Sequence, residues 1–540
     1  MEKKSGDNQS VKFLMQGALL LSIAGFIAKI LSAVYRVPFQ NMVGNTGFYV
    51  YQQVYPIYGI GMTLALSGFP VFFSNLIAEQ HGGQKIASII KHGFLLLSVL
   101  ALVIFLSLYT FAAQIAFWMG DAQLTPVIQS VSWMFLLMPF LVLVRGYFQG
   151  SFRMMPTAIS QVVEQLVRVA VILIAAGIFT KVGGDVYQMG GWAMSSATIA
   201  ALAASLILLY FVRQERALLM EQENSWLTHK ESAAYSWRIL IRRLIVEGGT
   251  ICLLSSILVL YQLIDSFTVF NGLLEQGLLA DMAKNLKGIY DRGQPLVQLG
   301  LVVGVGFSSS YMPLMSRAYS QGNMAEVKQS AKSLLRMTMA FSTTATIGII
   351  AILPRLNHML FGDMQGNAAL SVYVLSIWLA SMMLAYHGIL QSINQYRITL
   401  MGLAIGLLVK LLLNQLFVVD MGTLGASLIT VLGLTIMLLF MYGLTPSFVK
   451  GSLRPNKFIR KLLFGNFLLF LVVGILNLGL NVAFPNGLSR GMDSLMVFLQ
   501  VIVGLMTFLV YAVRSDLFTQ GEWASIPKGK TIYKRLSKEQ

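Results

Sequence analysis

Residues 144–171 read VRGYFQGSFRMMPTAISQVVEQLVRVAV, in which a short basic turn joins two apolar helices. The second predicted helix, residues 156–180, is apolar enough to cross a membrane, yet it carries Glu164 and Arg168 one helical turn apart. An ion pair at this spacing costs less inside a membrane than two isolated charges would, although it is still unfavourable. Charged side chains within membrane spans mark functional sites by default, so we expect this stretch to contribute to the activity.

A weaker copy of this stretch lies 242 residues further along the chain. Residues 387–413 read HGILQSINQYRITLMGLAIGLLVKLLL. The matched positions are Gly146 and Gly388, Gln149 and Gln391, Thr157 and Thr399, and Arg168 and Lys410. The copy predicts a molecule made of two related halves.

The amino-acid composition indicates an integral membrane protein. Of the 540 residues, 56% are hydrophobic and 11% are charged, and the mean hydropathy is +0.71. A soluble globular domain carries about 25% charged residues. We count about fourteen apolar stretches long enough to cross the hydrocarbon layer, and their continuous apolar character favours helices over barrel strands. The predicted fold class is all-α, a polytopic membrane protein with about fourteen transmembrane helices.

The repeat divides these helices into two six-helix lobes plus two C-terminal helices. The predicted segments are an N-lobe at 13–212, a cytoplasmic linker at 213–243, a C-lobe at 244–445, the last two spans at 446–513 and a basic tail at 514–540. Both lobes begin on the same side of the membrane, which predicts parallel repeats related by an axis along the membrane normal. Binding sites in such transporters lie between the halves near the midplane.

The placement of basic residues predicts the orientation of the chain. The net charge is +17, and most Lys and Arg residues fall in segments on the side of the two termini. By the positive-inside rule, both termini are expected in the cytoplasm. The N-terminal MEKKSGDNQS is interpreted as a cytoplasmic tail and not as a cleaved signal peptide. The basic excess therefore predicts contact with membrane lipids and no nucleic-acid partner.

Neither a metal nor a cofactor is expected. The single cysteine, Cys252, lies in a predicted span, so the sequence contains no disulfide or metal framework. We also expect no catalytic residues.

The predicted span at residues 48–77 is rich in Tyr and Gly. Pro56 and Pro70 predict that this helix is bent or broken. Its tyrosines allow two interpretations, an aromatic belt at the membrane interface, which is the commoner arrangement, or a platform for a sugar. They are Tyr49, Tyr51, Tyr55 and Tyr58.

Three motifs together resemble a known family. They are the run RGYFQG…PTAISQVVEQLVRV, the pair Lys29 and Arg36 in the first span, and YDRGQPLVQLG at residues 290–300. They resemble the MOP exporter superfamily and, within it, the polysaccharide and lipid II flippase branch of Gram-positive bacteria, which includes sporulation proteins. The resemblance extends from about residue 13 to about residue 510.

The resemblance implies a flippase of the bacterial cytoplasmic membrane. Such proteins move undecaprenyl-pyrophosphate-linked saccharides from the inner to the outer leaflet by alternating access. The implied partners are an undecaprenyl-linked glycan and membrane lipids. Cell-wall synthesis enzymes are further candidates, and we expect a monomer.

In lipid II flippases of this branch, basic residues on the first, second and eighth spans face a central cavity. The resemblance implies this role for Lys29 and Arg36, and for Arg292 with its neighbour Asp291. This sequence has no Lys or Arg at residues 37–84, so a second-span cation is missing. Pro295 also replaces an acidic residue expected three positions after the arginine. A lipid-linked glycan other than lipid II therefore remains open.

The predicted substrate would need a cationic site. A pyrophosphate is neutralised bidentately by Arg, or by Lys as a point charge. The candidate substrate-binding residues, which are the basic residues predicted inside spans, are Lys29, Arg36, Arg168, Arg292 and Lys410. The candidate coupling or structural charges are Glu164, Asp265 and Asp291.

Each of these cations also has a purely structural interpretation. Lys29 and Arg36 could extend toward an interface, and Arg168 could form a structural pair with Glu164. Near the cytoplasmic boundary, Glu247 is predicted to pair with Arg242 or Arg243.

Three classes of function stay open, with the flippase favoured. The alternative is an Na⁺- or H⁺-coupled multidrug exporter of the same superfamily, but a cationic-drug site calls for acidic or aromatic residues, whereas the predicted buried charges are mainly basic. The third is a glycan polymerase or ligase that uses polyprenyl-linked donors. Its catalytic residues usually lie in a large external loop, and the longest one predicted here spans only residues 271–287. We therefore expect a transporter and not an enzyme.

Overall fold

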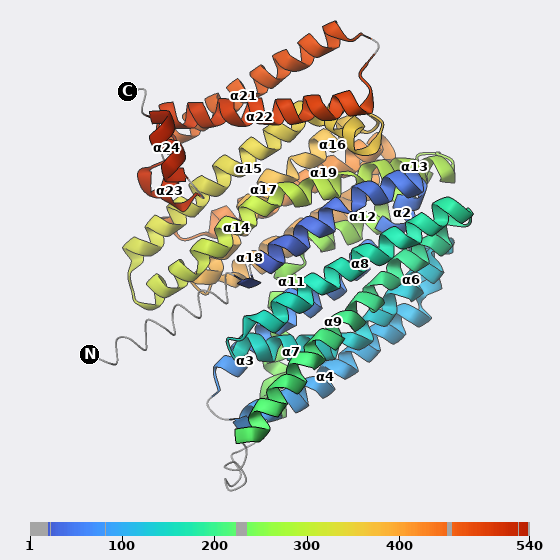
Figure 1. Ribbon diagram of the computed structural model, residues 1–540, viewed down its shortest axis with the longest axis vertical. Helices are drawn as coiled ribbons and strands as arrows, with labels where there is room; N and C mark the ends of the chain where they lie inside the picture. Colours follow the sequence, from blue (N-terminus) through green and yellow to red (C-terminus); the bar gives the residue numbers. More distant parts are fainter. Residues whose placement is uncertain are drawn as a thin grey trace. The chain divides into compact units, whose positions relative to one another are not determined.

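In a computed structural model of the protein, the residues described are 20–21, 23–80, 83–222, 235–450, 456–485, 487–526 and 529–537. These residues form helices and connecting turns, with no strand among them (Figure 1). The all-α prediction is confirmed. By their internal contacts the residues divide into two compact units, unit 1 at Met1–Gly288 and unit 2 at Ile289–Gln540.

Unit 1 contains the helices of the first seven predicted spans. In chain order they are α2 (Arg36–Thr63), η1 (Leu64–Gly68), α3 (Phe69–Ala78), α4 (Gly83–Thr110), α5 (Ala112–Trp118), η2 (Ala122–Leu124), α6 (Thr125–Ser132), η3 (Trp133–Leu137), α7 (Met138–Gly150), α8 (Met154–Val182), α9 (Val186–Gln222), α10 (Trp237–Arg243), η5 (Leu244–Gly248), α11 (Gly249–Ser255) and α12 (Ile257–Glu275). Helix α13 (Ala280–Asp291) crosses the boundary between the units.

Unit 2 contains the remaining helices. They are α14 (Gly293–Ser320), α15 (Met324–Phe361), α16 (Asn367–Val374), α17 (Ser376–Ser392), α18 (Tyr396–Met421), α19 (Thr423–Leu444), α20 (Ser447–Lys450), α21 (Asn456–Ala483), α22 (Arg490–Arg514), α23 (Gln520–Ser525) and α24 (Gly529–Ser537). The compact units divide later in the chain than the lobes predicted from the repeat, because α12 packs on α2 within unit 1. The lobe boundaries stay a prediction.

Thirteen helical segments of the described residues are long and apolar enough to cross a membrane. The first, Ile23–Ala78, has 56 residues, and at about 1.5 Å per residue it is nearly three times as long as the hydrocarbon layer is thick. The chain turns back on itself within it at Gly44, whose φ of 69° and ψ of −177° are not helical. Across this turn the Tyr35 and Tyr51 hydroxyls are 2.9 Å apart. The segment is therefore a hairpin, whose first arm precedes Gly44 and whose second arm follows it as far as Ala78. The two arms account for the fourteenth predicted crossing.

The second arm of this hairpin is broken near Pro70, as predicted, whereas Pro56 lies within the continuous helical part of α2. Residues Leu64–Gly68 form a π-helical turn, η1, and Pro70 follows it at the start of α3. A π-helical turn interrupts the regular pattern of backbone hydrogen bonds and commonly occurs at functional sites. The carbonyl oxygen of Ala65, in this turn, accepts a hydrogen bond from Arg145 of the site described below.

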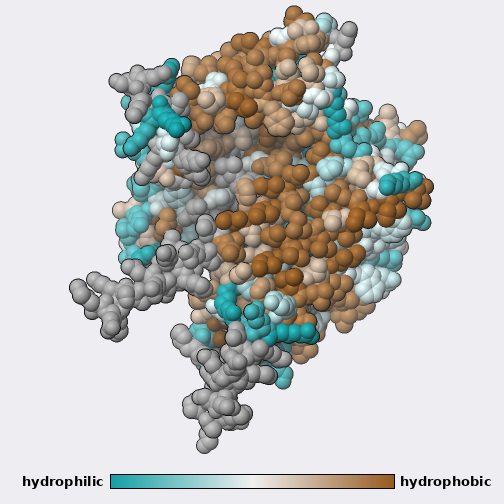
Figure 2. Space-filling view, in the orientation of Figure 1, coloured by the Kyte–Doolittle hydropathy of each residue, from teal (hydrophilic) through white to brown (hydrophobic). Residues whose placement is uncertain are grey.

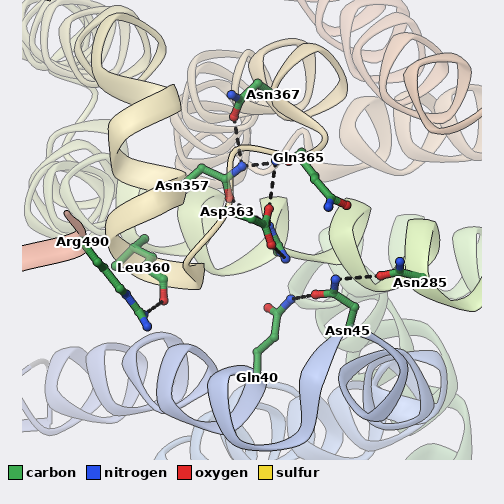
Figure 3. Close-up of polar contacts among 10 residues, drawn as sticks. Gln40, Asn45, Asn285, Asn357, Leu360, Asp363, Gln365, Asn367 and Arg490 are labelled. Atoms are coloured by element: carbon green, nitrogen blue, oxygen red, sulfur yellow. Dashed lines mark hydrogen bonds and ion pairs between the residues drawn. The ribbon is translucent and has the colours of Figure 1, made fainter. Parts of the chain in front are cut away.

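Helix α12 extends into the predicted external loop at residues 271–287 as far as Glu275, and helix α13 covers the end of the loop from Ala280 onward. Helix α13 is fixed to the hairpin turn by a chain of side-chain amides, in which Gln40 donates to Asn45 at 2.8 Å and Asn45 donates to Asn285 at 2.7 Å (Figure 3). The predicted loop is therefore shorter than expected, with residues 276–279 between the two helices. Polar residues of α13 such as Asp281, Lys284 and Asn285 led to its interpretation as a loop.

The repeat predicted from the sequence is present in the helix boundaries. Helix α7 ends at Gly150 and α8 begins at Met154, and α17 ends at Ser392 and α18 begins at Tyr396, each 242 positions later. Helices α8 and α9 pack together in unit 1, as do α18 and α19 in unit 2. Each unit therefore contains one copy of the same helix–turn–helix arrangement.

The predicted linker at residues 213–243 contains two helical parts. Helix α9 extends into it as far as Gln222, and α10 forms its end. Residues 223–234 lie outside the described part of the chain. At the end of α10, Arg243 binds Glu247 at 2.8 Å and Glu79 at 2.7 Å. The predicted pairing of Glu247 is thus confirmed, with Arg243 as the partner.

The last two predicted spans, α21 and α22, pack on α15 and on each other in unit 2. Their outward sides are apolar, with exposed side chains such as Phe464, Phe467, Phe498 and Ile502 (Figure 2). Exposed apolar surface along helices of this length fits contact with lipid tails.

Candidate anion-binding site

Arg36, at the start of α2, is fully buried in unit 1. None of its three guanidinium nitrogens has a hydrogen-bond partner among the described residues. Its guanidinium carbon lies 4.2 Å from the centre of the Tyr55 ring, on the other arm of the hairpin. Burying a cation without a counter-charge is unfavourable, so such a residue indicates a site for an anion.

Arg168, on α8, is buried beside the same hairpin. One nitrogen, Nη2, donates to the Ser32 hydroxyl at 3.2 Å, while Nε and Nη1 have no partner among the described residues. The guanidinium carbon lies 4.4 Å from the Tyr58 ring centre and 5.1 Å from that of Tyr35. Both arginines are thus held by tyrosine rings and not by carboxylates.

The tyrosine rings form one continuous array between the two arginines. Tyr51 and Tyr55 have ring centres 6.1 Å apart, and Tyr55 and Tyr58 have ring centres 5.5 Å apart. Positions 51, 55 and 58 share a helix face because they are four and three residues apart. Tyr35 joins the array from the first arm. We call the two arginines and these rings the Arg–Tyr cluster; its members are Arg36, Arg168, Tyr35, Tyr51, Tyr55 and Tyr58.

The prediction of an interfacial aromatic belt is wrong for these tyrosines. Tyr51, Tyr55 and Tyr58 are buried between helices, with relative exposures of 1%, 6% and 3%. Tyr49 is also buried, but it donates to Asp121 at 3.1 Å, outside the cluster. Composition alone could not show which way the rings point, because that depends on how the hairpin folds back.

The expected pair of Glu164 and Arg168 is also wrong. Glu164 is buried and binds Arg145 of α7, with 2.6 Å between Oε2 and Nη2. Arg145 further donates to Ser160 at 3.2 Å and to the carbonyl oxygen of Ala65 at 3.1 Å. Ala65 belongs to the π-helical turn η1, so the arginine joins α7 and α8 to the bend in the second arm.

Lys29 is exposed, unlike the two arginines. In the described part of the chain it forms no hydrogen bond or ion pair. Lys29, Ser32 and Arg36 are three and four residues apart, so they lie on one face of the first arm. Lys29 therefore extends the cationic face that leads to the Arg–Tyr cluster.

Arg292 and Asp291 are both buried in unit 2 but have different partners. Arg292 binds Asp363 through two nitrogens, each at 2.7 Å, and also donates to Asn357 at 3.2 Å. Asp291 accepts a hydrogen bond from Gln294 at 3.2 Å. The Arg292 charge is thus balanced by a carboxylate, unlike that of Arg36.

The partners of Arg292 belong to a small polar network between α15 and α16. Asn357 donates to the carbonyl of Gln365 at 2.8 Å and to Asn367 at 3.0 Å (Figure 3). The backbone N–H of Gln365 donates to Asp363 at 2.9 Å. Burial alone would raise the pKa of Asp363, but the hydrogen bonds from Arg292 and Gln365 outweigh it and lower the pKa below its ordinary value.

The remaining predicted site residues, Lys410 and Asp265, are buried in unit 2 and unit 1, respectively. Lys410 donates to the Thr430 hydroxyl on the neighbouring helix α19. Among the described residues, no three His, Cys, Asp or Glu side chains come together as metal ligands.

The sequence interpretation missed several buried cations, namely Arg145, Lys287, Arg336 and Arg355. Arg336 binds Glu522 at 2.7 Å, and Arg355 binds Asp493 at 2.6 Å. The sequence analysis places Arg145 at the short basic turn between two apolar helices, whereas the structure places it within helix α7. The ion pairs of Arg336 and Arg355 join segments more than 130 residues apart, and no local pattern indicates them.

Among the described residues, thirteen helical segments are long and apolar enough to cross a membrane, so the fold is that of a polytopic membrane protein. A family model described as "Polysaccharide biosynthesis protein" matches residues 14–319, which is more than half of the chain. The chain belongs to this family.

Two relatives from Bacillus subtilis (strain 168) are similar to the chain. It is 36% identical to the uncharacterized membrane protein YabM over 537 residues, covering 98% of this chain and 97% of YabM. It is 28% identical to the lipid II flippase MurJ over 448 residues, covering 79% and 81%.

Two solved structures share the fold. A lipid II flippase MurJ in an inward closed conformation matches with a TM-score of 0.66 at 14% identity, over 92% of this chain and 98% of that one. An inward-facing multidrug resistance MATE transporter of the MOP superfamily matches with a TM-score of 0.62 at 13% identity, over 81% and 99%. The family model and the MurJ relative confirm the resemblance to the polysaccharide and lipid II flippase branch. The solved structures show that the chain shares its fold with a transporter of the MOP superfamily. The protein is a multi-pass membrane protein.

Proposed function

We propose that the protein is a flippase for a pyrophosphate-linked saccharide carried on an undecaprenyl lipid, and that it works by alternating access in the bacterial cytoplasmic membrane. The observation that carries this proposal is the Arg–Tyr cluster, in which five guanidinium nitrogens of two buried arginines have no partner among the described residues. The similarity to a lipid II flippase supports the same class of cargo.

The chemistry of the cluster fits a pyrophosphate. Guanidinium groups bind phosphate oxygens bidentately, and such charge-assisted hydrogen bonds are roughly twice as strong as neutral ones. The tyrosine rings stabilise both cations while the site is empty, at about 0.5–2 kcal/mol for each contact. Because the rings carry no negative charge, they do not compete for the cations as a carboxylate would.

The other candidate residues have secondary roles in this proposal. Lys29 attracts the anion along the exposed face of the first arm. Arg292 and Lys410 are proposed to bind the substrate in another conformation of the transport cycle. Asp265 and Asp291 are proposed as coupling charges. We also propose that both termini lie in the cytoplasm, where the anionic lipid precursor is made.

A leaflet assay tests this function. Cells that lack the protein are complemented with the wild type, Arg36→Ala, Arg168→Ala or the exposed α10 control Arg238→Ala, and an outer-face probe quantifies undecaprenyl-linked saccharides. We expect exposure of the saccharide with the wild type and the control, and a loss of at least tenfold with either cluster variant. Normal exposure in cells without the protein, together with altered tolerance to cationic dyes, would instead indicate a multidrug exporter.

A further inference from the structure

Glu164 lies where it could neutralise the proposed anion site. It precedes Arg168 by four residues on α8, the spacing at which a glutamate and an arginine on a helix normally pair. Arg168 has two guanidinium nitrogens with no partner among the described residues, so it could accept this pairing. A carboxylate bound there would occupy the same donors that a phosphate needs.

The Glu164 carboxylate binds Arg145 of helix α7 and not Arg168. The contact of 2.6 Å between Arg145 Nη2 and Glu164 Oε2 is at the short end for a charge-assisted hydrogen bond, and both side chains are buried. Arg145 is itself fixed at two further points, since Nε donates to Ser160 and Nη1 donates to the Ala65 carbonyl. The guanidinium therefore has a defined position from which it draws Glu164 away from Arg168.

The second copy of the repeat supplies an internal comparison. Lys410 occupies the position of Arg168, but Gly406 occupies the position of Glu164, so no acid precedes the cation by one turn. The position of Arg145 is taken by His387, whose Nδ1 lies 3.4 Å from the Thr399 hydroxyl. The arginine thus occurs in the copy that has the glutamate, and it is replaced in the copy that lacks it.

We propose that Arg145 is a positioning residue of the anion site, which binds Glu164 and thereby leaves Arg168 available for phosphate. This inference rests on the proposed function. Arg145 itself makes no contact with the substrate. Its effect on binding is exerted entirely through the carboxylate of Glu164.

A rescue experiment tests this role with the full-length protein in lipid nanodiscs. The affinity for inorganic pyrophosphate is measured by calorimetry for the wild type, Arg145→Gln, and the double variant Arg145→Gln/Glu164→Gln. We expect Arg145→Gln to weaken binding at least tenfold, because the released Glu164 carboxylate pairs with Arg168. The double variant should recover to within about threefold of the wild type, because an amide cannot neutralise Arg168. Binding in the double variant as weak as in Arg145→Gln would overturn the proposal.

Arg145→Lys keeps the test decisive if Arg145→Gln does not fold. A lysine retains the positive charge that attracts Glu164, so this variant should bind pyrophosphate within about threefold of the wild type. A tenfold loss in Arg145→Lys, with an unchanged unfolding temperature, would also overturn the positioning role.

Arg168→Ala separates this inference from the proposed function. If Arg168→Ala binds pyrophosphate as tightly as the wild type, the anion site itself is wrong. If Arg168→Ala loses binding while the double variant is not rescued, the anion site stands and only the role of Arg145 fails.

Discussion

Phe152 and Asn394 adopt the same left-handed backbone conformation, with φ angles of 60° and 59°, and they lie 242 residues apart. Each occupies the turn between the paired helices of its repeat, α7 and α8 in one case and α17 and α18 in the other. A left-handed conformation is uncommon for a residue other than glycine and is unfavourable for a bulky one such as Phe152. The two copies have therefore kept the same turn geometry although the residues in the turns differ.

The matched glycines Gly146 and Gly388 are expected to respond in opposite ways to alanine. A Cβ atom at Gly146 would lie 2.7 Å from Cβ of Phe73 and 3.2 Å from the carbonyl of Pro70, so α7 and α3 would have to separate. Overpacking of this kind costs about 1–3 kcal/mol. A Cβ atom at Gly388 meets nothing within 4 Å, and alanine there should gain up to about 1 kcal/mol of helix propensity.

Thermal unfolding of the two purified variants in detergent checks this prediction. Gly146→Ala should lower the unfolding temperature, and Gly388→Ala should leave it unchanged or raise it slightly. Equal shifts in both variants would show that the close packing of α7 on α3 does not limit stability.

Tyr58 tests whether a ring, and not a hydroxyl, positions Arg168. Tyr58→Phe keeps the ring 4.4 Å from the guanidinium and removes a hydroxyl that has no partner among the described residues. Tyr58→Leu removes the ring and a cation–π contact of about 0.5–2 kcal/mol. We expect Tyr58→Phe to bind inorganic pyrophosphate like the wild type. We expect Tyr58→Leu to bind about 2- to 10-fold more weakly, because the Arg168 side chain is no longer held in place and must be ordered on binding.

Calorimetry on both variants provides the measurement, with the exposed Tyr210→Leu as the control for loss of an aromatic ring on another helix. If Tyr58→Phe were as weak as Tyr58→Leu, the hydroxyl would be the group that matters.

The Arg292–Asp363 pair predicts a pH dependence of stability. Because folding lowers the pKa of Asp363, its stabilising contribution is complete above the ordinary aspartate pKa of about 3.9 and is lost as the pH falls through the lowered value. The difference in unfolding temperature between the wild type and Asp363→Asn should therefore stay constant from about pH 8 to pH 5. It should shrink below about pH 4.

Unfolding temperatures recorded across this pH range, with the exposed Asp281→Asn as the control, check the sign. A difference that grows on acidification would contradict the assignment of Arg292 as the partner that lowers the pKa.

Much of the fold follows from patterns that are local in the sequence. Apolar length predicts the spans, and the matched residues at a separation of 242 predict the helix–turn–helix repeat. Arg36 and Arg168 could be identified as candidates because a charge within an apolar run is visible without a structure. The pairing of Glu247 with Arg243 also follows from helix spacing.

What could not be predicted depends on contacts between segments distant in the chain. Helix spacing alone pairs Glu164 with Arg168, and only the packing of α7 against α8 brings Arg145 close enough to bind it instead. The burial of the tyrosines depends in the same way on the turn at Gly44. In both cases the sequence shows which groups are present but not which of several available neighbours they contact.

The hairpin around Gly44 bears on how the protein is made. Tyr55 follows Arg36 by 19 residues on the opposite arm, so this half of the Arg–Tyr cluster is complete once a single contiguous segment has left the ribosome. Arg168 follows Ser32 by 136 residues and reaches the membrane much later. The hairpin therefore contains, within one contiguous segment, the ring contact that partly offsets the cost of burying Arg36.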